Sequence, residues 1–72
     1  MEFYYKIDVS GRNGYSFMVK SSSELDEGEV IDKALEQGYF NDVIDADYAV
    51  VDDLVTPYDI DHFTECECVY EV

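Results

Sequence analysis

Two short runs that alternate apolar and polar residues open the chain, and they restrict its fold more than any other feature. Residues 2–9, EFYYKIDV, and residues 15–20, YSFMVK, both follow the period of two that is typical of half-buried strands. Between them, SGRNG carries two glycines and an asparagine, which is a strong turn signal. The pattern predicts a β-hairpin with one apolar face that a further element must cover.

The next segment, SSSELDEGEVIDKALEQG, supplies a helix to cover that face. Ser23 or Asp26 can cap its start, and Asp26 and Glu29 have the spacing of a capping box. An apolar stripe at helical spacing runs through Val30, Ile31, Ala34 and Leu35. Gly38 occupies the position of a glycine that ends a helix.

The second half of the chain predicts shorter elements. Residues 39–47 form either a short helical turn that Asn41 caps or a loop, and YAVV at 48–51 has the composition of a strand. TPYDIDHF at 56–63 starts like a short helix, with Thr56 as the cap and Pro57 in the first position. TECECVYEV at 64–72 alternates again, as a strand does.

We therefore expect a single α+β domain over residues 1–72, in the order β-β-α-β-(short α)-β. Its sheet would be small and mostly antiparallel, with about four strands. The main helix would pack on one face of the sheet, and the other face would meet solvent.

Charge is the second informative feature. The 18 acids and four bases give the 72-residue chain a net charge of −14, well beyond the magnitude of roughly 2–8 that is usual for a small soluble domain. All four bases precede residue 34, and eleven acids follow it. A basic protein surface is the natural complement of such a chain. Nucleic acid and anionic membranes are not expected partners, because both require basic contacts.

Location and chemistry are constrained by what the sequence lacks. It has no apolar run of membrane-spanning length and no secretory signal pattern, and its two cysteines make no disulfide framework, so we expect a cytoplasmic protein. A nucleophile–histidine pair and a phosphate-binding loop are both missing, so we expect neither an enzyme nor a cofactor.

We expect no metal site, but two metals need to be weighed, zinc and calcium. His62, Cys66 and Cys68 could hold zinc if a nearby carboxylate completed the tetrahedron, although two thiols on one strand face equally suit a core. The stretch DVIDADYAVVDD lacks the D-x-D-x-D-G pattern and the distal glutamate of a calcium-binding EF-hand loop.

The candidate partner-binding residues are the carboxylates of residues 42–67, whose spacing could imitate the phosphates of DNA. On a strand, where alternate residues project from one face about 6.7 Å apart, Glu65, Glu67 and Glu71 would form a row. The alternative is a solvated acidic face that serves only solubility. The candidates are Asp42, Asp45, Asp47, Asp52, Asp53, Asp59, Asp61, Glu65 and Glu67.

In size and charge profile, with DVIDADYAVVDD and YDIDHFTECE as its densest parts, the chain resembles the small acidic DNA-mimic inhibitors of phages and mobile elements. These are the anti-CRISPR and anti-restriction proteins. The resemblance implies a monomer or weak dimer, acting in a host bacterial cell, that blocks the DNA-binding site of a basic target such as a Cas surveillance complex. A different class fits the same sequence: a small structural or regulatory subunit that binds through its sheet edge or an apolar face.

Overall fold

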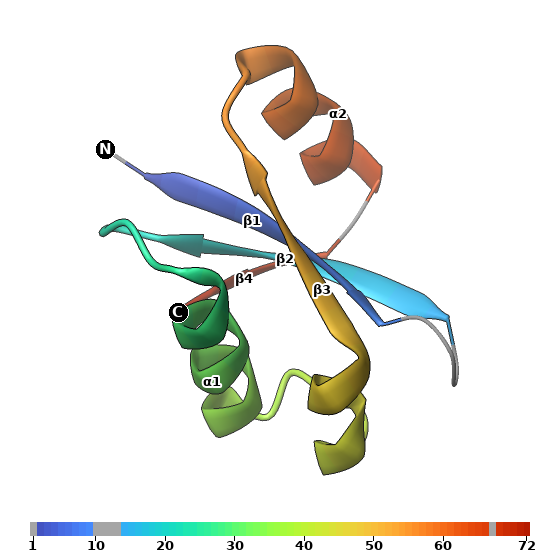
Figure 1. Cartoon of the computed structure of the whole chain (residues 1–72). Coiled ribbons are helices and arrows are strands. Elements are labelled where there is room, and N and C mark those ends of the chain that lie inside the picture. The colour runs from blue at the N-terminus through green and yellow to red at the C-terminus, as the bar shows by residue number, and fades with distance from the viewer. Residues whose placement is uncertain (1, 10–13, 67) are drawn as a thin grey trace.

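A computed structural model of the chain describes residues 2–9, 14–66 and 68–72. One four-stranded sheet, in the order β3-β1-β2-β4, forms its centre (Figure 1). β1 pairs antiparallel with β2 and with β3, whereas β4 runs parallel to β2. The expectation of an α+β fold with a mostly antiparallel sheet is confirmed. The elements are β1 (Phe3–Val9), β2 (Tyr15–Ser21), α1 (Glu27–Gln37), the 3₁₀-helix η1 (Val43–Tyr48), β3 (Ala49–Leu54), α2 (Pro57–Cys66) and β4 (Val69–Glu71).

The hairpin of β1 and β2 carries the core on one of its faces. In its register Ile7 lies opposite Phe17 and Tyr5 lies opposite Val19, and all four side chains are buried. Strand pleating places each such pair on the same face. α1 covers this face with Val30 and Ala34, which are fully buried. Burial of this apolar face is the main driving force for the fold.

The ends of α1 follow the sequence signals closely. Asp26 is the N-cap, and its carboxylate accepts a hydrogen bond from Glu29 N at 2.8 Å. The Glu29 side chain accepts from Asp26 N in return, which completes the predicted capping box. At the other end Gly38 has φ = 82°, the left-handed conformation that glycine adopts without steric cost.

The last part of the chain differs from the expectation. α2 continues to Cys66, so residues 64–66 are helical, and β4 has only three residues. The Thr56 hydroxyl accepts from Asp59 N at 3.2 Å, and this cap together with Pro57 starts the helix as predicted. Once the helix has started, each further residue adds a backbone hydrogen bond, and this outweighs the weak alternation of 64–66.

The second face of the sheet meets solvent only in part, because α2 lies over it, across the sheet from α1 (Figure 1), while Val50 on the same face stays 51% exposed. Lys6 projects from that face with its Nζ 4.7 Å from the centre of the Phe63 ring. Met18, the partner of Lys6 in the hairpin register, has no exposed surface. The fold therefore has three layers, with a helix on each side of the sheet.

An aromatic cluster attaches β4 to the rest of the molecule. Tyr70 stacks on Tyr39 with ring centres 4.4 Å apart and meets Phe17 edge-on at 5.8 Å. The Tyr39 hydroxyl donates to the carbonyl of Glu71 at 2.6 Å. Because Tyr39 directly follows the glycine cap of α1, the end of that helix determines where the last strand lies.

Candidate partner-binding surface

Seven of the nine candidate carboxylates lie on three consecutive elements of the chain. η1 leads into the edge strand β3, and β3 leads into α2 on the second face of the sheet; Figure 1 shows this path running from the yellow-green turn to the orange helix. We call these seven residues the acidic edge. All are exposed except Asp59, which is partly buried: Asp42, Asp47, Asp52, Asp53, Asp59, Asp61 and Glu65.

The local secondary structure determines the direction in which these acidic side chains project. Asp42 is the N-cap of η1 and accepts from Ile44 N at 3.3 Å. Asp52 and Asp53 are neighbours on a strand, so they project to opposite faces of the sheet, beside Lys6 and Tyr5 respectively. Asp61 and Glu65 are four residues apart on α2 and therefore share one side of that helix.

Asp45 does not belong to this surface, although the sequence analysis included it. Its side chain has no solvent exposure, and its Oδ2 accepts a hydrogen bond from the Tyr15 hydroxyl at 2.7 Å. That hydroxyl in turn accepts from Asn41 N at 3.0 Å. Asp45 therefore ties η1 to β2 inside the protein and presents no charge to a partner.

The contact between Tyr15 and Asp45 also changes the pKa of Tyr15. Burial of the phenol, together with its hydrogen bond to Asp45, raises the pKa of Tyr15 above its ordinary value of 10.0. Ionisation would place a second negative charge beside the buried carboxylate. Tyr15 therefore favours its protonated state, in which its hydroxyl can donate.

Two other expectations about the acids need adjustment. Glu65 lies on α2 and not on a strand, so the row that was predicted for Glu65, Glu67 and Glu71 does not form. Glu67 lies outside the described residues. The loss of the row follows from the extension of α2, because helical residues rotate around an axis instead of alternating between two faces.

Lys6 and Lys20 form their ion pairs with carboxylates outside the acidic edge, although Lys6 lies opposite Asp52 in the sheet. Lys6 Nζ lies 3.4 Å from Asp8 Oδ2, and Lys20 Nζ lies 3.4 Å from Glu71 and 3.7 Å from Glu2. The Glu2 charge, followed by the hydrogen bond with Glu71, raises the pKa of Lys20 above its ordinary 10.5. Within the ranges that the structure describes, no acidic-edge carboxylate forms an ion pair. No lysine of the described ranges therefore neutralises the charge of this edge by direct pairing.

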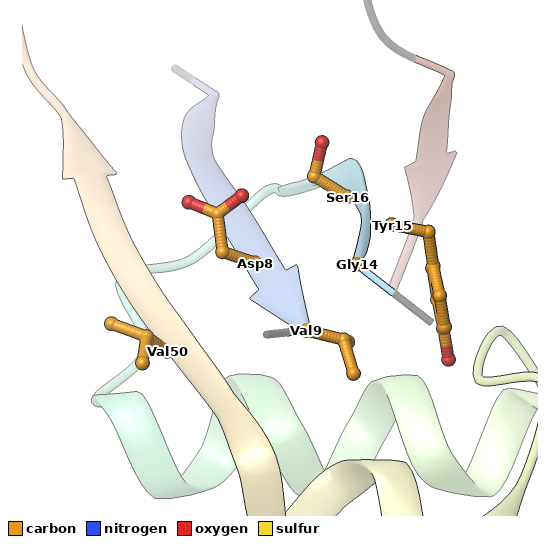
Figure 2. Close-up of a pocket in the computed structure, with 6 residues that line it drawn as sticks. All are labelled: Asp8, Val9, Gly14, Tyr15, Ser16 and Val50. Atoms are coloured by element: carbon orange, nitrogen blue, oxygen red, sulfur yellow. The ribbon is translucent and has the colours of Figure 1, made fainter. Parts of the chain in front are cut away.

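A hollow of about 380 Å³ lies where β1 ends and β2 begins (Figure 2). Asp8 and Ser16 project to one side of the sheet there, while Val9 and Tyr15 point towards the opposite side. The described lining of the hollow contains one carboxylate, already paired with Lys6, and neither histidine nor cysteine. This lining offers no acid–base pair for catalysis.

The metal alternative gains no support from the described residues, which contain no group of three or more histidine, cysteine and acidic side chains able to hold an ion. His62 instead stacks on Tyr58, with ring centres 6.2 Å apart, and contacts Phe63. Cys68 is a free, exposed cysteine, and the Cys66 side chain lies outside what the structure describes.

Exposed apolar residues beside the acidic edge are the feature that the sequence analysis located least well. Val43, Val55 and Tyr58 are 72%, 81% and 77% exposed, and Val50 on β3 is 51% exposed. The exposure of Tyr58 could be expected from the acids around it in the sequence. The valines, by their composition alone, fit a buried core equally well. Aromatic and apolar side chains among charges are a common composition of protein-binding surfaces.

Comparison with protein-family models, with curated protein sequences and with solved structures gives no match. Among the described residues, no helix is both long and apolar enough to cross a membrane.

Proposed function

We propose that this protein is a non-enzymatic, cytoplasmic inhibitor that uses the acidic edge to occupy the DNA-binding site of a basic partner. The observation that carries the proposal is the charge of that edge: seven carboxylates over three consecutive elements, none of which a lysine of the described ranges neutralises by direct pairing. An anti-CRISPR or anti-restriction role, against a Cas surveillance complex or a similar target, is the form of this function that the charge profile favours.

In this mechanism the carboxylates take the place of phosphates against lysine and arginine. The molecule is 31 Å long, and successive phosphates of one DNA strand are about 3.4 Å apart along the axis, so it can cover roughly nine base steps. Because β3 is part of the ordered sheet, its carboxylates are held in place, and this lowers the entropy lost on binding. The net charge of −14 also speeds encounter with a basic surface at low salt.

A second function fits one specific observation. β3 is an edge strand with an exposed valine, Val50, and it leads to the exposed Val55 and Tyr58. An edge strand can pair with a strand of another protein. Such a regulatory or structural subunit would bind with little dependence on salt, and substitution of the exposed apolar residues would weaken it.

Matched charge reversals separate the two functions. The edge variant carries Asp47→Lys, Asp61→Lys and Glu65→Lys, and the control variant carries Glu27→Lys, Asp32→Lys and Glu36→Lys on α1. Each changes the net charge by the same amount at exposed positions. Circular dichroism and thermal melts establish that both variants fold.

Both variants and the wild type are then used as bait in a host lysate at low salt, with elution by salt or by duplex DNA. We expect the wild type and the control to retain a DNA-binding protein that either eluent releases, and the edge variant to lose it. Equal retention by the two variants, or a captured protein that ignores salt and DNA, would overturn the proposal. A salt-insensitive capture would favour the sheet-edge function.

A further inference from the structure

A small hollow between the start of β1 and the end of β3 differs from the rest of the acidic edge. Its volume is about 260 Å³, and its lining includes Phe3, Tyr4, Tyr5 and Leu54. Glu24, from the segment before α1, and Asp53, from β3, also line it. It thus combines aromatic walls with two exposed carboxylates, and its lining contains no lysine or arginine among the described residues.

The sheet register explains why these groups converge. Tyr4 lies opposite Leu54, and Tyr5 lies opposite Asp53, so the last pairs of the β1–β3 ladder form the floor. Tyr5 is 3% exposed, and its hydroxyl accepts from Leu25 N at 2.8 Å. That hydrogen bond fixes the backbone next to Glu24 against the same strand. The hollow is therefore built on rigid elements and is formed before any partner arrives.

We infer that this hollow binds the side chain of one arginine from the basic partner. The inference rests on the proposed function, because it takes from it that the partner is basic. A guanidinium stacks on aromatic rings and binds carboxylates through paired hydrogen bonds, whereas an ammonium group provides only a point charge. The lining provides both kinds of contact: the partly exposed Phe3 ring, which shares a sheet face with Asp53, for stacking, and Glu24 with Asp53 for the charge.

Size and charge argue against other occupants. A volume of 260 Å³ lies below the roughly 300–1,000 Å³ of small-molecule sites, so it suits a side chain better than a free cofactor. A second copy of this chain would bring a further charge of −14, and the repulsion between two such charges opposes its approach. The exposed Val55 at the rim would contact the partner around the arginine.

The test uses the full chain and two capped tripeptides, Gly-Arg-Gly and Gly-citrulline-Gly, which have the same shape but differ in charge. Amide shifts in ¹H–¹⁵N NMR spectra report where each peptide binds. We expect saturable shifts at Tyr4, Tyr5, Glu24 and Asp53 with the arginine peptide. The citrulline peptide should produce none.

Two isocharged variants locate the site. Glu24→Gln with Asp53→Asn should weaken arginine-peptide binding about tenfold, the loss expected for two part-exposed charge pairs. Asp47→Asn with Asp61→Asn should leave it within about twofold, because these residues lie on η1 and α2 and act only through screened charge.

Equal weakening by the two variants, shifts spread along the acidic edge, or equal binding of citrulline would overturn the inference. Such a result leaves the proposed function standing if the Lys-substituted edge variant still fails to capture its target. If arginine binds the hollow but the edge variant captures its target normally, the proposed function fails and the hollow remains as an arginine site.

Discussion

The hydroxyl of Tyr15 offers the sharpest test of how η1 is held, and Tyr15→Phe removes that single atom. The ring and its stacking on Phe17, with centres 6.3 Å apart, are kept. Two hydrogen bonds are lost: the one donated to Asp45 Oδ2 at 2.7 Å and the one accepted from Asn41 N at 3.0 Å. The first involves a charged, fully buried group, and the second an exposed backbone amide.

These contacts set the magnitude. A hydrogen bond to a charged group contributes about 1.5–3 kcal/mol, and water can replace most of the exposed one. We therefore expect a loss of about 2 kcal/mol in the free energy of unfolding. A domain of this length has roughly 4–11 kcal/mol in total, so the change is a large fraction of its stability. The melting temperature should fall by roughly 8–16 °C.

Urea unfolding followed by circular dichroism measures the change as a shift of the midpoint at constant slope. Tyr58→Phe is the matched control, because Tyr58 is 77% exposed and its ring keeps its stacking on His62. The control should stay within about 0.5 kcal/mol of the wild type. A Tyr15→Phe loss as small as that of the control would refute the reasoning that this hydroxyl holds η1 in place.

Two further predictions concern pH and a helix end. The pKa values of Tyr15 and Lys20 are higher in the folded than in the unfolded chain, so the protonated forms of both side chains stabilise the fold below pH 10.0. This stability is lost as the pH rises through the folded pKa values. Midpoints of urea unfolding that stay constant from pH 8 to 11 would contradict this prediction. Gly38→Ala should destabilise by about 1–2 kcal/mol, because φ = 82° strains any other residue. The control is Gly28→Ala, where a Cβ would meet only Asp26 Oδ1 at 3.6 Å. It should stabilise the fold by up to about 0.5–1 kcal/mol, and urea unfolding measures both changes.

Local signals in the sequence predicted much of the fold. The alternation of residues 2–9 and 15–20 gives β1 and β2, and the Asp26–Glu29 capping box gives the start of α1. These predictions succeed because their physical cause lies within a few residues of the element. The length of α2 was missed because TECECV alternates weakly while a well-capped helix already extends into it.

The candidate site was predictable in part, for the same reason. Most of its acids are exposed, as their charge predicts. Asp45 is instead buried and bonded to the hydroxyl of Tyr15, which lies 30 residues earlier in the chain. Composition and periodicity cannot indicate a contact over that distance. Nor could they indicate the β1–β3 hollow, which depends on pairing Tyr4 with Leu54 and Tyr5 with Asp53, partners far apart in the sequence.

The hairpin has a further consequence for the order in which the elements of the chain assemble. Three of the four bases and only two of the 18 acids fall within residues 1–20, so the segment that contains the hairpin is slightly positive. Its strands pair over a short loop, whereas the β1–β3 ladder must close a loop that reaches from Tyr4 to Leu54. The hairpin is therefore expected to form before the β1–β3 ladder, and its slight positive charge attracts the strongly acidic second half of the chain towards it.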